Sequence, residues 1–200
     1  MTAVRENWFL LVDPVWVREN DGEVPPIQSV LGGWLLDDGR PIRFLGNPGY
    51  VPSRPDSPSD LVDAALVLLL DGRLDARQFQ LLLRESTCEI ALNAYGRPLV
   101  AWSPDEVRCV VAATSAVHRR TRAAGWLPVA FRELVEHLGD DLDVLVNPGG
   151  VRSVRLVGEF VRAAALLDDR EAAEVCATLR DSGVGVLTET LPIAEGRPSS

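Results

Sequence analysis

The sequence predicts an α+β fold in which an antiparallel or mixed β-sheet is flanked by helices. Apolar and polar residues alternate with a period of two from Thr87 to Asn93, as they do in a half-buried strand. Two earlier stretches, 60–70 and 76–84, are rich in apolar residues and begin at or just after an aspartate that can cap a helix. A third stretch, 125–162, contains strand, helix, strand, tight turn, strand and helix patterns in succession.

Composition and charge limit the classes of protein that the chain can belong to. Of its 200 residues, 46% are hydrophobic and 24% are charged, which suffices for one large domain or two small ones. All twenty basic residues are arginine, and the formal net charge is −9. This charge argues against nonspecific binding to nucleic acid or anionic lipid, and a basic protein surface fits it better.

The sequence indicates neither export nor insertion into a membrane. No apolar signal region follows a basic start, and no apolar stretch approaches the roughly 20 residues that a membrane span needs. We therefore expect a cytoplasmic protein without membrane insertion.

The first 58 residues predict a small β module that ends in a proline-rich linker. Apolar runs bounded by turn residues indicate about three strands, and Asp37-Asp38-Gly39 is typical of a hairpin turn. The predicted strands are 7–14, 29–36 and 41–45. Residues 46–58 are rich in Pro, Ser and Gly and are expected to form a linker or strap.

Residues 59–167 predict the main α+β domain. Its first two helices, 60–70 and 76–84, are expected to pack as an antiparallel pair, and the next three strands to form an antiparallel meander. The predicted strands are 87–93, 98–102, 107–113, 126–129, 142–146 and 151–156, and the predicted helices that follow the first pair are 114–124, 131–138 and 159–167. For the segment 168–200 we expect a polar helix, a short apolar run at 184–190 and a loose tail.

One tripeptide occurs twice. Asn47-Pro48-Gly49 and Asn147-Pro148-Gly149 each follow an apolar strand, so an internal duplication is an open alternative to coincidence. Gly149 and Gly150 could present backbone amides to an anion. A tight turn with positive φ explains these glycines more simply, and we favour it.

The residues that usually perform catalysis or bind metal form no recognisable pattern. The three cysteines lie far apart, and Cys88 and Cys109 stand in apolar stretches that predict burial. Glu133 and His137 are spaced as two metal ligands on one helical face, but no third ligand accompanies them, so an amphipathic helix is favoured. The serines lie in no nucleophile motif, and neither histidine has an identifiable partner. We expect no cofactor, no metal and no catalytic residue.

Two groups of residues are candidates for binding a protein partner. The only dense positive cluster could receive an anion or an acidic helix, although a solvated helix face is favoured because no glycine-rich loop accompanies it. Two aromatic residues in predicted loops could anchor an interface, with core packing as the alternative. The candidates are His118, Arg119, Arg120 and Arg122 for the first group, and Trp16 and Tyr50 for the second.

Two blocks of the sequence resemble known families. The stretches 7–14, 22–26, 31–34 and 43–53, with Arg43-Phe44-Leu45-Gly46-Asn47-Pro48-Gly49-Tyr50 among them, are similar in order and spacing to the N-terminal half of the actinobacterial type VII secretion system-associated proteins. Residues from about 60 to 167 look like an SseB-like domain, through Trp126-Leu127-Pro128-Val129 and the run 144–156. The resemblance covers roughly 7–167 and brings no catalytic residues with it.

The resemblance implies a non-enzymatic accessory factor, an adaptor or chaperone-like protein associated with type VII secretion. Its partner would be a secretion substrate or a component of the apparatus, and a homodimer stays open. The alternative is a cytosolic immunity protein that neutralises a secreted toxin, which would also be acidic and noncatalytic. A third class, a small-molecule enzyme, predicts a deep pocket with converging polar groups.

Overall fold

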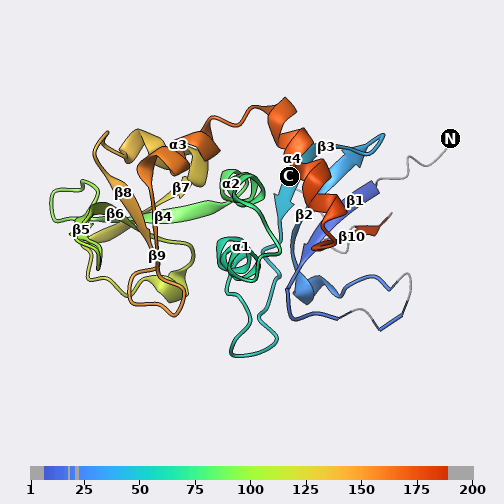
Figure 1. The fold of residues 1–200 in the computed structure, drawn as a ribbon. Coiled ribbons are helices and arrows are strands. Elements are labelled where there is room, and N and C mark those ends of the chain that lie inside the picture. The colour runs from blue at the N-terminus through green and yellow to red at the C-terminus, as the bar shows by residue number, and fades with distance from the viewer. Residues whose placement is uncertain (1–6, 18, 21–22, 189–200) are drawn as a thin grey trace, which may run out of the picture.

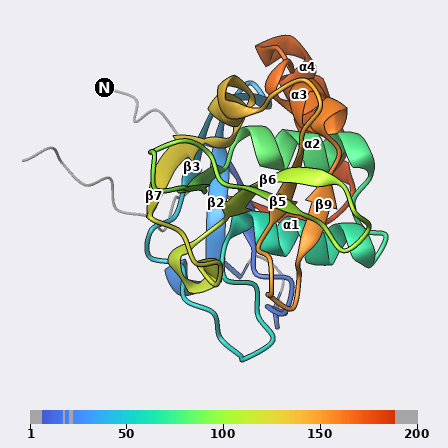
Figure 2. The same cartoon turned by 90° about the vertical axis from the view of Figure 1, so that its left-hand side faces the viewer.

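The computed structural model describes residues 7–17, 19–20 and 23–188, and it has the α+β fold that the sequence predicts. Two β-sheets lie at opposite ends of the molecule with two helices between them, and further helices cover the upper side in the view of Figure 1. Figure 2 looks at the second sheet, whose strands pass in front of these two helices.

The first sheet, sheet A, has the strand order β10-β1-β2-β3, and all its pairs are antiparallel. Its strands are β1 (Asn7–Val12), β2 (Val30–Asp37), β3 (Arg40–Gly46) and β10 (Gly185–Thr188). Asp38 and Gly39 both have positive φ, as a two-residue hairpin loop between β2 and β3 requires. The sequence predicted about three strands here, and the fourth comes from the segment 168–200.

The central strands of sheet A, β1 and β2, are buried on both faces, whereas β3 is exposed or half-buried along its length. Trp8 and Leu10 form one cluster with Val30, and Phe9 and Leu11 belong to the main core on the opposite face. On the core side, the rings of Phe9 and Trp34 stack at 5.7 Å. A short 3-10 turn, η1 (Ile27–Ser29), precedes β2.

The two helices between the sheets begin where the sequence predicts. In α1 (Leu61–Leu70), the N-cap Asp60 accepts a hydrogen bond from the backbone N–H of Asp63. In α2 (Ala76–Arg84), Asp75 and Gln78 form a capping box. Most of α1 is apolar all round, which suits a helix between two layers.

The second sheet, sheet B, is mixed. Its order is β7-β4-β6-β8-β9, β5 pairs with β6, and only the β6–β8 pair is parallel. Its strands are β4 (Thr87–Leu92), β5 (Val100–Trp102), β6 (Arg108–Ala113), β7 (Gly125–Ala130), β8 (Asp143–Val146) and β9 (Val154–Leu156).

The predicted antiparallel meander is wrong in its strand order. A meander would place β5 between β4 and β6, whereas β6 pairs with β5 along its first half and with β4 at its far end. Both strands therefore lie on the same side of β6.

Two predicted helices are 3-10 segments instead. The stretch 114–124 contains only η2 (Ala116–His118), and 131–138 contains η3 (Phe131–His137). Ser115 does not cap η2, because its hydroxyl lies 3.4 Å from that of Ser59. η3 follows Ala130, whose side chain cannot accept a hydrogen bond.

The last described elements return the chain to sheet A. Helix α3 (Gly158–Ala165) is followed by α4 (Asp169–Asp181), whose buried face packs on α2 and β3, and then by β10. Only glycine fits at position 185 in β10, because a Cβ there would lie 2.5 Å from the carbonyl oxygen of Leu10. The predicted tail from residue 189 onward lies outside the described residues.

The two sheets share one hydrophobic core. A single cluster includes Phe9 and Trp34 from sheet A, Phe79 from α2, and Ile90 and Val110 from sheet B. The predicted boundaries near residues 58 and 167 fall in loops, and the segments that they separate pack on this common core. Within the described ranges, no helix has both the length and the apolar composition that crossing a membrane requires.

Candidate functional site

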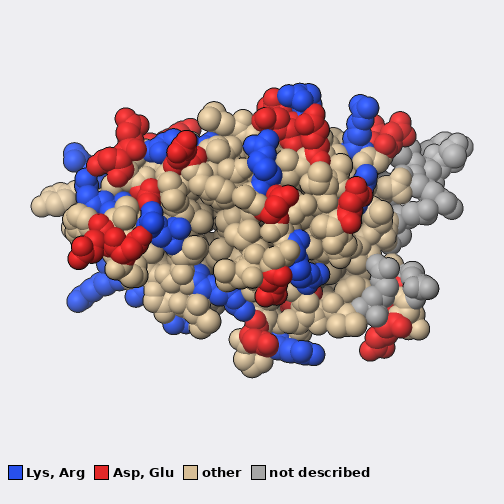
Figure 3. Space-filling view, in the orientation of Figure 1, with Lys and Arg blue, Asp and Glu red and all other residues tan. Residues whose placement is uncertain are grey.

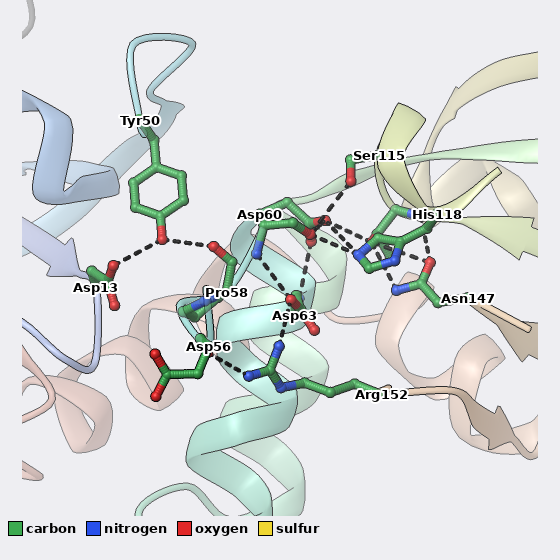
Figure 4. A network of polar contacts seen from close by, with 12 residues as sticks. Asp13, Tyr50, Asp56, Pro58, Asp60, Asp63, Ser115, His118, Asn147 and Arg152 are labelled. Atoms are coloured by element: carbon green, nitrogen blue, oxygen red, sulfur yellow. Dashed lines mark hydrogen bonds and ion pairs between the residues drawn. The ribbon is translucent and has the colours of Figure 1, made fainter. Parts of the chain in front are cut away.

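A cluster of polar side chains lies where the parallel strands β6 and β8 end and α1 begins (Figure 4). The residues after these strands, Thr114 and Asn147, are joined side by side. Asn147 is fully buried with φ of 53°; its Oδ1 accepts a hydrogen bond from the Thr114 amide at 2.9 Å, and its Nδ2 donates to Thr114 Oγ1 at 3.0 Å. Gly150 donates its amide to the Asn147 carbonyl, so this amide closes the turn.

In the first Asn-Pro-Gly turn the asparagine is also buried, but neither Asn47 nor Gly49 has the positive φ of Asn147 and Gly149. The buried Asn47 donates from Nδ2 to the carbonyl oxygens of Ile27 and Val30. The strand before this turn also runs antiparallel to its neighbour, whereas β8 runs parallel to β6. The two turns therefore share a tripeptide but differ in backbone conformation and in strand arrangement.

Asp60 connects this cluster to α1. Its Oδ2 accepts hydrogen bonds from Thr114 Oγ1 and Ser59 Oγ, both at 2.7 Å, while its Oδ1 caps the helix. One carboxylate therefore holds the start of α1 against the end of sheet B.

His118 completes the cluster. Its Nε2 lies 2.7 Å from Ser59 Oγ, which directs its own proton to the Asp60 carboxylate. Ser59 Oγ therefore accepts a hydrogen bond from Nε2–H, and Nδ1 is left buried with no hydrogen-bond partner among the described residues. A nucleophilic serine needs the reverse arrangement, in which the imidazole accepts the hydroxyl proton and a third group orients it.

A buried ion pair lies below this cluster. Asp63 Oδ2 accepts hydrogen bonds from the Ser59 amide at 2.9 Å and from Arg152 Nη1 at 3.0 Å. The Asp63 side chain is only 2% exposed, and Arg152 also donates to the backbone carbonyl of Asp56. The pair ties the segment after β8 to α1, and the bond to Asp56 ties it to the linker before α1.

The aromatic candidates Tyr50 and Trp16 meet at one buried aspartate. The Tyr50 hydroxyl lies 3.0 Å from Asp13 Oδ2 and 2.8 Å from the carbonyl oxygen of Pro58. Burial, together with the hydrogen bond to Asp13 and its charge, raises the pKa of Tyr50 above its ordinary value. The Trp16 amide donates to the Asp13 carbonyl, and its half-buried ring lines a cleft of about 410 Å³ beside β10.

The predicted arginine candidates do not converge on one site. Arg119 makes two hydrogen bonds to the Glu89 carboxylate, which raise its pKa, and Arg120 donates to the carbonyl of Gly149 at 2.9 Å. Arg122 is exposed, and no described residue forms an ion pair with it. The candidates therefore lie in two places. Trp16 and Tyr50 lie around Asp13, whereas His118 contacts Ser59 and the arginines follow it in the chain.

Sequence reasoning missed a groove between the two sheets. Two adjoining clefts of about 320 and 200 Å³ follow the outer edge of β3 and share Phe44 and Glu85 in their walls. Asp60 and Thr114 line the second cleft, so the polar cluster forms one end of the groove. The feature that could have revealed it is Pro41, because proline within a strand belongs at a sheet edge.

The backbone of β3 offers hydrogen-bonding groups to this groove. The Asn47 amide donates to the Leu31 carbonyl across the pair with β2. Since alternate residues of an antiparallel strand face the partner strand, Leu45 faces β2, while Phe44 and Gly46 direct their N–H and C=O groups away from it.

Among the described residues, no group of three or more His, Cys, Asp and Glu side chains converges as metal ligands would. Comparison of the chain with protein-family models, with curated proteins and with solved structures found no match.

Proposed function

We propose that the protein is a non-enzymatic, protein-binding accessory factor that holds an extended segment of its partner in the groove along β3. The observation that supports this proposal best is the outer edge of β3, which lies open inside a groove between two sheets. An extended peptide can add to such an edge through main-chain hydrogen bonds, and pockets for alternate side chains then select the sequence.

The walls of the groove suit a segment with both apolar and charged side chains. Trp34 and Phe44 line it, with ring centroids 4.7 Å apart, and Ile42 is 62% exposed at its rim. Arg132 is exposed beside them, and no described residue forms an ion pair with it. An apolar residue followed by an acidic one would match this end of the groove.

The noncatalytic part of the proposal depends on the polar cluster. The Ser59 hydroxyl is held as a donor to Asp60, and the titratable side chains nearby are engaged in fixing α1 to sheet B. Such an arrangement stabilises a joint between two sheets and does not activate a nucleophile.

The association with type VII secretion is proposed from the sequence resemblance alone. On that basis the protein acts in the cytoplasm as an adaptor or chaperone-like factor, and its partner is a secretion substrate or an apparatus component. In the alternative, a toxin that the protein neutralises would occupy the same groove. The two proposals are therefore distinguished by identifying the bound partner.

Site-specific photocrosslinking in the organism that makes this chain tests the proposal. A photoreactive phenylalanine analogue replaces Ile42 in the groove, or Val151, which is 94% exposed on the turn after β8, as the control. We expect one protein to crosslink at position 42 and not at 151, with mass spectrometry placing the crosslink in an extended segment. A secretion component supports the main proposal, a toxin supports the alternative, and equal crosslinking at both positions contradicts the groove.

Two substitutions at Gly46 supply a matched pair for the same experiment. A Cβ at this position meets nothing within 4 Å, so Gly46→Ala should leave both the fold and the crosslink unchanged. Gly46→Phe adds a ring beside the groove wall and should abolish the crosslink while the melting temperature stays the same. Retention of the crosslink in Gly46→Phe would overturn the proposal.

A further inference from the structure

The short strand β5 carries an unusual amount of exposed apolar surface. Trp102 is 68% exposed and Val100 is 38% exposed, although tryptophan is usually largely buried. Tyr95, on the turn that leads into β5, is 88% exposed. Exposed aromatic side chains on one edge of a sheet are typical of a protein interface.

The outer edge of β5 also has unused hydrogen-bonding directions. Val111 donates its amide to the Leu99 carbonyl at 3.0 Å, and Ser103 donates to the Val107 carbonyl at 2.8 Å. The Leu99 carbonyl and the Ser103 amide therefore face β6, as does Ala101 between them, while the Leu99 amide donates to the Ala91 carbonyl near the end of β4. The backbone groups of Val100 and Trp102 consequently point away from the sheet.

We propose that this edge pairs with β5 of a second copy of the chain, antiparallel and about a two-fold axis at Ala101. In this register Val100 lies opposite the partner's Trp102, and both residues have outward-facing backbone groups. The two equivalent pairs exchange main-chain hydrogen bonds and place a β-branched side chain against an aromatic one on each side of the axis, a favourable cross-strand combination.

The charges at the two ends of β5 select the antiparallel arrangement. Arg97 precedes the strand, and Glu106 lies in the turn after it; both are exposed, and no described residue forms an ion pair with either. Antiparallel pairing brings Arg97 of one copy toward the partner's Glu106, whereas parallel pairing would bring like charges together. Acidic and basic residues are interspersed at this end of the molecule, at the left in Figure 3.

This edge fits a second copy because three properties match about one axis. The hydrogen-bonding register, the Val100–Trp102 pairing and the Arg97–Glu106 ends are all self-complementary, as an isologous interface requires. One short strand covers little surface, so the dimer should form reversibly and depend on concentration.

Sedimentation equilibrium over a range of protein concentrations tests the inference. The wild type should show a reversible monomer–dimer equilibrium, and Trp102→Glu should weaken dimerisation about tenfold or more. Val151→Glu makes the same kind of change at an exposed valine outside β5 and should leave the equilibrium unchanged. A wild type that stays monomeric throughout, or a Trp102→Glu variant that dimerises like the wild type, would overturn the inference.

Exchanging the charges at Arg97 and Glu106 distinguishes loss of this specific interface from a general loss of apolar surface. Arg97→Glu and Glu106→Arg should each weaken the dimer, and the double variant should restore it, because both contacts regain opposite charges. Failure of the double variant to recover would exclude the antiparallel register. Gly46→Phe should dimerise normally, so failure of the proposed groove and failure of this interface are distinguishable.

Discussion

The Nε2 atom of His118 lies 2.7 Å from the hydroxyl oxygen of Ser59, a residue 59 positions earlier in the chain. This contact joins η2, which follows β6, to the residue before the N-cap of α1. It belongs to a network in which Asp60, Thr114 and Asn147 hold the start of α1 against the end of sheet B. Its contribution to stability and the reactivity of its serine can be measured separately.

Ser59→Ala should lower the free energy of unfolding by about 1–2 kcal/mol, because it leaves the buried Nε2–H of His118 without an acceptor. Urea denaturation measures this difference. Ser53→Ala removes the same group from an exposed position and should change stability by less than about 0.5 kcal/mol. Equal effects at the two positions would show that the contact with His118 contributes nothing.

A fluorophosphonate probe for reactive serines should leave Ser59 unmodified. Its hydroxyl proton is directed to Asp60, and His118 Nδ1 has no described partner to orient the ring. Intact-mass spectrometry measures the result, with a known serine hydrolase as the positive control. Labelling of Ser59 that disappears in His118→Ala would contradict the noncatalytic assignment.

Arg152→Met should destabilise the protein by about 3 kcal/mol, because it leaves the buried Asp63 carboxylate unpaired. Adding Asp63→Asn should recover part of the loss, since the uncompensated charge is then absent. The control is Arg170→Met, which breaks the exposed pair with Glu174 and should cost about 0.3–0.5 kcal/mol. Thermal unfolding of the wild type and the three variants gives these values, and equal losses for Arg152→Met and Arg170→Met would rule out a structural ion pair.

Stability should fall at alkaline pH. Burial raises the pKa of the Cys88 and Cys176 thiols to about 12. Unfolded thiols lose their protons above about pH 9, so this stabilisation is complete below pH 9 and decreases as the pH rises towards 12. The loss should be about 1 kcal/mol per thiol for each pH unit above pH 9.

Urea midpoints between about pH 8 and 10, under reducing conditions, measure this decline. The chain has no lysine, so few other groups titrate in this range. The Cys88→Ala, Cys176→Ala double variant should be less stable overall but should show a flatter dependence on pH. An unchanged slope would mean that the thiols are not the cause.

Gly185→Ala should release β10 from sheet A. The added Cβ would lie 2.5 Å from the Leu10 carbonyl oxygen and closer still to the ring of Phe9. Hydrogen exchange should accelerate in residues 185–188 and in β1, while sheet B keeps its protection. Gly125→Ala is the control because its Cβ would make an ordinary contact of 3.9 Å with Leu92, and equal effects of the two variants would contradict the predicted clash.

The parts of the fold that the sequence predicted depend on neighbouring residues. The caps Asp60 and Asp75 lie within three residues of the amides that they bind, and the alternation in β4 is a local pattern. The helices α1 and α2 and the strands therefore appear close to their predicted positions. Local patterns could not predict the parallel β6–β8 pair or the pairing of β10 with β1, because these strands are distant in sequence.

The sequence predicted which residues belong to the candidate site but not how they are arranged in space. Trp16, Tyr50 and His118 were selected from residue type and loop position, but the contacts of Tyr50 with Asp13 and of His118 with Ser59 join distant segments. The exposure of Trp102 likewise depends on which side of β6 its strand occupies. Pro41 was the one local indication of an open edge.

The pairing of β10 with β1 affects how the protein is made. A ribosome synthesises β1 first and β10 only after all of sheet B, so sheet A lacks one of its strands during most of translation. Throughout that interval the backbone of Trp8, Phe9 and Leu10 lacks the neighbour that it has in the finished fold. The nascent chain must therefore keep this apolar strand from aggregating until residue 188 has left the ribosomal tunnel.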